Sequence, residues 1–270
     1  LSGDAHERGA LRARLTDLYE HRLGDKDRAF DHALEQLRES PGDAAARGHV
    51  ERLAEGCGRW EDVTVVYEMV AERAADEEAM AHMWRRAGEI RRDQLHDIPS
   101  AIADFEAARA VTPDDPAILA ALDALFVRSG NAELRVAILL ERAGLSDDPD
   151  AKAELLLETA EVYETELGNL EGAATVLEEA RVLDAGRVRA LDALDRIYRA
   201  RSEWERLLEV LDARLLEAET DTVRVSLLRD KAGVLAVQLS DAARAIECWV
   251  ELVEIEPGDV ADPKAIERLS

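Results

Sequence analysis

Apolar residues recur along the chain at spacings of three and four, which places them on one face of a helix. In residues 151–186, one such face is formed by Leu155, Leu156, Ala160, Val162 and Tyr163. The next face is formed by Ala173, Ala174, Leu177 and Ala180. This spacing predicts consecutive amphipathic helices joined by short turns, and therefore an all-α fold.

The helical pattern itself repeats along the sequence. Leucines recur at intervals of 72 residues, at Leu23, Leu95, Leu167 and Leu239. Three further columns keep the same interval: Ala29, Ala101, Ala173 and Ala245; Leu18, Ile90, Val162 and Val234; and Leu11, Met83, Leu155 and Leu227. Four columns that persist without a gap indicate an internal repeat.

Turn-forming residues follow the same period. One column holds Asp25, Asp97, Asn169 and Asp241, whose side chains can accept hydrogen bonds from the free N–H groups at the start of a helix. Another holds Pro41, Pro113 and Pro257, where proline stops the preceding helix, with Ala185 as the exception. A third holds Gly58, Gly130 and Ser202, between two further helices of each repeat. Each repeat is therefore predicted to contain four helices, or two hairpins.

We predict that residues 1–270 form one right-handed α-solenoid of stacked antiparallel hairpins with a 72-residue double-hairpin period. The predicted hairpins are about 5–42, 43–78, 79–114, 115–150, 151–186, 187–221 and 222–258, followed by a shortened one at 259–270. Because the chain begins at Leu1 without Met and the last hairpin is short, we expect it to be a piece of a longer array.

One hairpin resembles a known family closely. Residues 79–116 carry Trp84, Gly88, Ala101, Phe105 and Pro113, which follow the tetratricopeptide pattern W-x2-L-G…A-x3-F…P, with Ala87 in place of the usual Leu. The resemblance implies that Trp84 fills the gap between neighbouring hairpins, that Gly88 and Ala101 let two helices approach, and that Pro113 ends the second helix. Residues 5–45, 151–186 and 222–258 resemble weaker copies that keep Ala29, Ala173 and Ala245, and Trp60 and Trp204 share a position in other hairpins.

This chain departs from the family at further points. Arg91 stands where the family has an aromatic residue, Gln36 and Leu252 stand where it has a small alanine, and the first helix of each odd-numbered hairpin is one residue longer. In such arrays the first helix of each hairpin lines the concave face, where ligands bind. The resemblance therefore implies a partner-binding face that includes His82, Arg85, Glu89, Arg92, Arg189, Arg196 and Arg199.

Two interpretations of the arginines remain open. In one, Arg189, Arg196 and Arg199 pair with Glu154, Glu161 and Glu164 on the adjoining helix, at a gain of roughly 0–1 kcal/mol each. In the other, the arginines contact an acidic or C-terminal segment of a partner.

The net charge of −25 narrows the classes of partner. A nucleic acid or an anionic membrane surface would be repelled, and no apolar run approaches the roughly 18 residues that span a bilayer. A protein or peptide is expected as the partner, and the acidic surface favours a basic one. Acidic clusters in predicted turns are either solvated turns or a docking strip: Asp76, Glu77 and Glu78; Asp147, Asp148 and Asp150; and Glu217, Glu219 and Asp221.

No pattern of catalytic or cofactor-binding residues is present. The sequence has no phosphate-binding glycine loop, no H-E-x-x-H pair and no C-x-x-C pair, so we expect no catalytic residues, no metal and no cofactor. The prediction is a protein-interaction scaffold. The alternatives are a structural spacer or self-associating segment of a large protein, and an accessory domain of an enzyme whose catalytic part lies elsewhere. The sequence does not indicate a compartment, and the cytoplasm is the default expectation.

Overall fold

The computed structural model describes the backbone of residues 2–74 and 76–255, and the side chains from residue 8 onward in these ranges. The predicted short hairpin at 259–270 and Pro257 lie outside the described residues. The chain divides into two compact units, Leu1–Ile138 (unit 1) and Leu139–Ser270 (unit 2), and the division falls inside one helix. The prediction of one continuous right-handed array stays a prediction.

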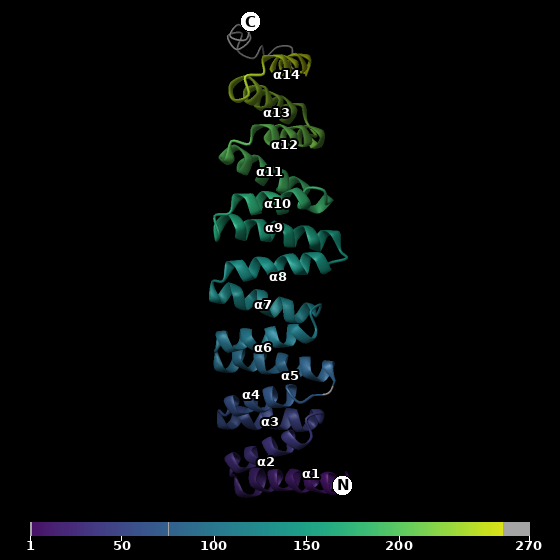
Figure 1. Ribbon diagram of the computed structural model, residues 1–270, viewed down its shortest axis with the longest axis vertical. Coiled ribbons are helices and arrows are strands. Elements are labelled where there is room, and N and C mark those ends of the chain that lie inside the picture. The colour runs from purple at the N-terminus through teal and green to yellow at the C-terminus, as the bar shows by residue number, and fades with distance from the viewer. Residues whose placement is uncertain (1, 75, 256–270) are drawn as a thin grey trace. The chain divides into compact units, whose positions relative to one another are not determined.

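Unit 1 is built from helices that pack against their neighbours in the sequence (Figure 1). Its elements are α1 (Ser2–Asp17), the π-helical turn η1 (Leu18–Leu23), α2 (Lys26–Glu39), α3 (Ala44–Cys57), α4 (Trp60–Ala71), α5 (Glu77–Ile90), the π-helical turn η2 (Arg91–Leu95), α6 (Ile98–Val111), α7 (Pro116–Ser129) and the first part of α8 (Ala132–Leu145). Successive helices pair as antiparallel hairpins, for example α5 with α6.

Unit 2 has the same construction. It contains the rest of α8, then α9 (Pro149–Thr165), α10 (Leu170–Ala180), α11 (Asp184–Arg201), α12 (Trp204–Glu217), α13 (Asp221–Gly233), the π-helical turn η3 (Val234–Gln238) and α14 (Ala242–Ile255). No strand occurs in residues 2–74 and 76–255. The predicted all-α class, with stacked helix hairpins, is confirmed.

The helix starts follow the column of Asp and Asn residues. Four of these side chains accept a hydrogen bond from a backbone N–H in the first turn of the helix that follows: Asp25 from Arg28 (3.1 Å), Asp97 from Ser100 (3.2 Å), Asn169 from Gly172 (2.9 Å) and Asp241 from Arg244 (3.0 Å). The capping role predicted from the sequence is therefore confirmed in all four repeats.

The extra residue in the first helix of each odd-numbered hairpin is accommodated at the C-terminal end of that helix. In three repeats this end forms a π-helical turn, at η1, η2 and η3, and a π turn holds more residues than an α turn. Each helix is closed by a backbone hydrogen bond that spans six residues: Asp25 to Tyr19 (2.9 Å), Asp97 to Arg91 (2.9 Å), Asn169 to Tyr163 (2.7 Å) and Asp241 to Leu235 (2.8 Å).

Among residues 2–74 and 76–255, those with positive φ occupy two positions of the repeat. One position holds Gly24, His96, Gly168 and Ser240, and the other holds Gly58, Gly130 and Ser202. The φ values of Ser202 (57°) and His96 (53°) show that the turn geometry persists where glycine has been replaced, at the cost of some backbone strain. The surrounding hairpin therefore determines these turns.

Each unit has its own apolar core. Unit 1 contains one cluster around Phe30 and Tyr67 and another around Phe105 and Leu122. The Trp84 side chain packs against both clusters and so joins them. Unit 2 contains a single cluster around Leu194. The alanines of one repeat column, Ala29, Ala101, Ala173 and Ala245, are fully buried in the second helix of the first hairpin of each repeat.

Candidate functional site

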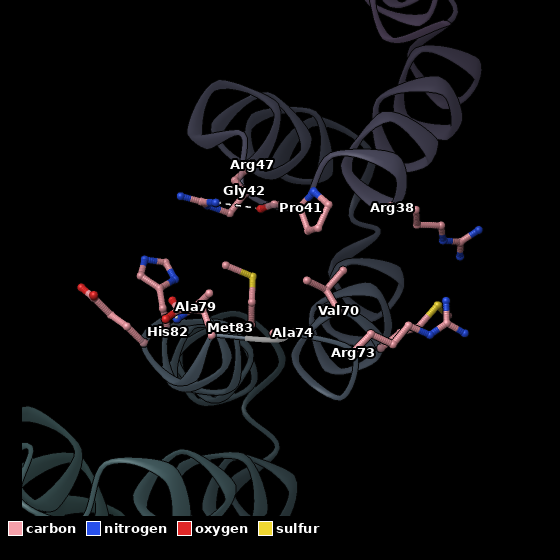
Figure 2. Close-up of a pocket in the computed structure, with 13 residues that line it drawn as sticks. Arg38, Pro41, Gly42, Arg47, Val70, Arg73, Ala74, Ala79, His82 and Met83 are labelled. Carbon is pink, nitrogen blue, oxygen red and sulfur yellow. Dashed lines mark hydrogen bonds between the residues drawn. The ribbon is translucent and has the colours of Figure 1, made fainter. Parts of the chain in front are cut away.

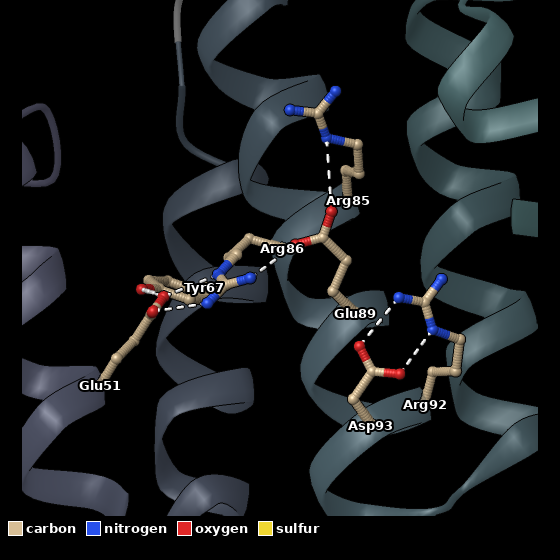
Figure 3. Close-up of polar contacts among 7 residues, drawn as sticks. All are labelled: Glu51, Tyr67, Arg85, Arg86, Glu89, Arg92 and Asp93. Atoms are coloured by element: carbon tan, nitrogen blue, oxygen red, sulfur yellow. Dashed lines mark hydrogen bonds and ion pairs between the residues drawn. The ribbon is translucent and has the colours of Figure 1, made fainter.

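The residues proposed from the sequence for a partner-binding face in unit 1 lie on α5 and η2. The Nε atom of Arg85 lies 3.8 Å from Oε1 of Glu89 on the same helix. Its Nη1 atom lies 3.6 Å from Oδ2 of Asp115, the residue that caps α7. Arg92 donates two hydrogen bonds to Asp93, from Nε (2.7 Å) and Nη2 (2.8 Å), and its guanidinium lies 5.9 Å from the centre of the Phe105 ring. These arginines are therefore engaged within the protein, as Figure 3 shows.

A tighter polar network lies beside them. Arg86 of α5 donates to both carboxylate oxygens of Glu51 on α3, at 2.8 and 2.6 Å, and to Glu89 at 2.6 Å (Figure 3). The Tyr67 hydroxyl donates to Glu51 at 2.7 Å. Burial raises the pKa of Glu51, but hydrogen bonds from Arg86 and Tyr67 outweigh it and leave this pKa below its ordinary value. The network thus holds a charged carboxylate between α3 and α5.

The predicted arginines of unit 2 lie on α11 and are also paired. Arg189 donates to Glu154 at 2.5 Å, and Arg196 donates to Glu164 at 3.0 Å. Arg199 does not pair with a glutamate of α9, because Asp195 on its own helix and Asp230 on α13 lie within its reach. Pairing within the protein therefore accounts for the contacts of all three arginines.

A cleft of about 570 Å³ opens in unit 1 next to this face. It lies between the turn from α2 to α3, the end of α4 and the first turns of α5. Figure 2 shows an apolar middle, with Pro41, Val70 and Met83 facing the cleft. Arg47 and His82 lie at one end, whereas Arg38 and Arg73 lie at the other.

His82 is the predicted site residue that reaches this cleft. Its Nδ1 atom is buried and has no hydrogen-bond partner among the described residues. Burial lowers the pKa of His82, and the charges of Arg47 and Arg85 lower it further. The ring is therefore neutral at neutral pH, and one of its nitrogens lies buried and unpaired beside the cleft.

Unit 2 contains a cleft at the same position of the repeat. It has a volume of about 360 Å³ and lies between the start of α11, the end of α12 and the first turns of α13. The lining residues Ala218, Val223 and Leu227 follow Ala74, Ala79 and Met83 of the first cleft by 144 residues, or two periods. The same hairpin geometry therefore forms a cleft at two positions that lie two periods apart.

The hairpin of α5 and α6 shows how the repeat is held together. A Cβ atom on Gly88 would lie 2.8 Å from Cδ2 of Phe105 and 3.3 Å from the carbonyl oxygen of Ala101, so only glycine allows this approach. Trp84, one turn earlier, joins the two cores of unit 1. Pro113 lies in the short turn between α6 and α7. In fold, this chain is a tetratricopeptide-like helical repeat protein.

No family model and no curated protein sequence matches the chain. Similar solved structures include a chain of Naa15/Naa10 bound to HypK-THB, with 18% identity over 93% of this chain and 37% of that one, at a TM-score of 0.49. A tetratricopeptide repeat protein from Parabacteroides merdae ATCC 43184 has 11% identity over 97% of both chains, at a TM-score of 0.39.

A third similar structure is YrrB, described as a tetratricopeptide repeat protein with an unusual peptide-binding site. It has 12% identity over 74% of this chain and 97% of that one, at a TM-score of 0.37. The chain spans about a third of the Naa15/Naa10 chain that it matches. With identities this low and TM-scores below 0.5, these are likenesses in fold and do not identify a partner.

The tetratricopeptide-like repeat brings together residues that the sequence patterns did not single out. Arg38, Arg47 and Arg73 come from three different segments and converge on the cleft of unit 1. A comparison of equivalent repeat positions could have singled out these arginines, because the residues two periods later are not basic: Val182, Leu191 and Glu217. The three arginines are therefore a property of this copy and are not shared by the copy two periods later.

The described residues contain no candidate for a membrane-spanning helix or for a metal site. No helix there has both the length and the apolar content needed to cross a membrane. Nor do those residues bring together three or more His, Cys, Asp or Glu side chains in a way that could hold a metal ion.

Proposed function

We propose that this chain is a protein-interaction scaffold that binds a partner at the clefts formed by its inter-hairpin turns. The observation that carries the proposal is the recurrence of the cleft two periods apart, in unit 1 and in unit 2. Concave sites with an apolar floor and a few polar groups are the usual form of binding sites. The role proposed is binding without catalysis.

The paired arginines support this choice of surface. On α5, η2 and α11, the predicted site residues Arg85, Arg92, Arg189 and Arg196 already have acidic neighbours within the protein. A ligand that used them would have to displace those neighbours. At the cleft, by contrast, the half-buried Val70 presents apolar surface without such competition, and the buried Nδ1 atom of His82 has no hydrogen-bond partner among the described residues.

The test is affinity capture from lysate of the native source on four immobilised forms of the full chain. Ala79→Trp fills the cleft of unit 1, and Val223→Trp fills the cleft of unit 2. Ala103→Trp is the matched control, because Ala103 is exposed on α6 and lines neither cleft. Circular dichroism verifies that all four forms are equally helical.

A partner recovered by the wild type and by Ala103→Trp, but lost from one cleft variant, is the expected result. A partner recovered equally by all four forms would refute binding at the clefts. If the wild type recovers no protein above background, the spacer or self-association alternative replaces the scaffold proposal.

A further inference from the structure

The two clefts share their place in the repeat but differ in charge. The cationic positions of the first cleft, Arg38, Arg47 and Arg73, are Val182, Leu191 and Glu217 two periods later, and His82 becomes Ser226. Part of the apolar lining is kept, since Ala74, Ala79 and Met83 become Ala218, Val223 and Leu227, whereas Val70 becomes Arg214. The two clefts therefore share part of their lining, but Arg38, Arg47 and Arg73 have no cationic counterpart at their own positions in the second cleft.

The cations of the first cleft flank its apolar middle from both ends (Figure 2). Arg47 is oriented by a hydrogen bond from its Nη1 to the carbonyl oxygen of Pro41 (2.8 Å). Arg38 pairs with Glu35, one turn earlier on α2, at 2.5 Å. The exposed Arg73 side chain has no ion pair with any described residue. The guanidinium group of Arg47 is therefore held in place by the protein, and that of Arg73 is free to bind a ligand.

The acidic residues that line this cleft, Asp76 and Glu78, lie at the start of α5 and form no ion pair with its arginines. Asp76 accepts a hydrogen bond from the backbone N–H of Ala79 at 3.0 Å, so its charge lies at the positive end of the α5 dipole. Glu78 is exposed in the first turn of the same helix, where the dipole also favours an anion. Arg38 is paired with Glu35, which leaves Arg47 and Arg73 without an ion pair to any described residue. The first cleft thus offers two unpaired guanidinium groups, in a chain whose net charge is −25.

We propose that the first cleft binds an acidic peptide segment of a partner protein, with an apolar side chain against the half-buried Met69 and Val70 and carboxylates at Arg47 and Arg73. The inference rests on the proposed scaffold function and specifies its ligand. Arginine binds carboxylates with two parallel hydrogen bonds, which fixes orientation. The flexible thioether of methionine adapts to differently shaped apolar groups.

The cleft of unit 2 is unsuited to the same ligand. Asp192, Glu217 and Glu219 line it, and its one arginine, Arg214, forms an ion pair with Asp192 at 3.1 Å. An acidic segment would be repelled there, because like charges brought into contact oppose binding. The two clefts therefore select different ligands, which revises the expectation of a basic partner for unit 1.

The test uses fluorescence anisotropy with the full chain and three labelled peptides of equal length. The first is acidic with a central Leu-Phe pair, the second is acidic with a central Ser-Ser pair, and the third is basic with the Leu-Phe pair. The variant is Arg47→Glu with Arg73→Glu. Its matched control is Arg14→Glu with Arg128→Glu, two exposed arginines outside the cleft that give the same change in net charge.

We expect the acidic Leu-Phe peptide to bind the wild type about tenfold or more tightly than either other peptide. Its affinity should fall about tenfold or more in the cleft variant, stay within about twofold in the control, and weaken with added salt. Ala79→Trp should abolish binding by a steric route, which keeps the test valid if the charge variant is destabilised.

Preferential binding of the basic peptide, or equal losses in the cleft variant and its control, would overturn the acidic-ligand proposal. So would the absence of binding by any of the three peptides. The scaffold proposal is judged separately by capture: a partner lost from Ala79→Trp that none of the acidic peptides displaces would leave the scaffold standing and this inference refuted.

Discussion

Replacing Gly88 by Ala is expected to destabilise unit 1, although alanine is the better helix former. Within a helix, Gly to Ala gains about 1 kcal/mol. At this position the new Cβ would lie 2.8 Å from Cδ2 and 2.9 Å from Cε2 of Phe105, a ring that is 1% exposed and has no space to move into. Inserting a methyl group into such a core costs about 1–3 kcal/mol.

Gly48→Ala is the matched control. Gly48 lies inside α3, is exposed, and has no atom within 4 Å of the position of a Cβ. It should therefore show only the gain of about 1 kcal/mol from helix propensity. Relative to this control, Gly88→Ala should lower the free energy of unfolding by about 1–3 kcal/mol.

Urea denaturation followed by circular dichroism measures the free energies of unfolding. Hydrogen exchange of the α5 and α6 amides adds a local measure, because repeat arrays need not unfold in one step. Equal stabilisation by Gly88→Ala and Gly48→Ala would show that α5 and α6 are not held as closely as the structure has them.

A double mutant separates the steric effect from other causes. Phe105→Leu removes part of the ring that the new methyl group would meet. In this background Gly88→Ala should cost less than in the wild type, by about 1 kcal/mol. If the effects of the two substitutions on the free energy of unfolding are additive, the destabilisation does not arise from the contact between residues 88 and 105.

Three further predictions concern charged groups. Burial raises the pKa of Asp104 from 3.8 to about 7, so the folded state binds the proton of this carboxyl group more tightly than the unfolded state. The wild type should therefore lose stability relative to Asp104→Asn as the pH rises from 3.8 to about 7, by at most about 4 kcal/mol. Urea denaturation of both proteins at several pH values measures this difference. Asp97→Ala removes the side chain that caps α6 and should lower the free energy of unfolding by about 1 kcal/mol, measured by thermal or urea denaturation. An unchanged free energy of unfolding would show that water replaces the carboxylate as the cap. Arg86→Met leaves the half-buried Glu51 without its main partner and should cost about 2–3 kcal/mol, whereas Arg189→Met, at an exposed ion pair, should cost less than about 1 kcal/mol in the same assay.

The repeat and its turns could be predicted from the sequence because they depend on local chemistry. A side chain such as Asp97 or Asn169 caps the helix that begins beside it, and a short-range interaction of this kind needs no knowledge of distant residues. The helical spacing of apolar residues likewise identifies buried faces. The all-α class and the hairpin pairing follow, since short turns leave consecutive helices no other arrangement.

The replacement of the family's aromatic residue at Arg91 shows the limit of this reasoning. The sequence identified the departure, but the structure shows its consequence. Arg91 lies between Glu68 of α4 and Asp104 of α6, and donates to Asp104 at 2.6 Å. The second carboxylate oxygen of Asp104 is buried and has no hydrogen-bond partner in the part of the chain that the structure describes. A buried ion pair of this kind depends on three helices at once.

The sequence by itself therefore determined the period, the helices, their caps and the close approach at Gly88. The tertiary structure decided which charges meet. Arg38, Arg47 and Arg73 are separated along the chain and converge only because two inter-hairpin turns lie next to each other at the cleft of unit 1. Likewise, Arg199 pairs with Asp230 instead of a glutamate of α9, because a long side chain takes whichever carboxylate the packing of α11 and α13 brings near. Helix formation is governed by neighbours in the sequence, whereas long charged side chains choose their partners in space.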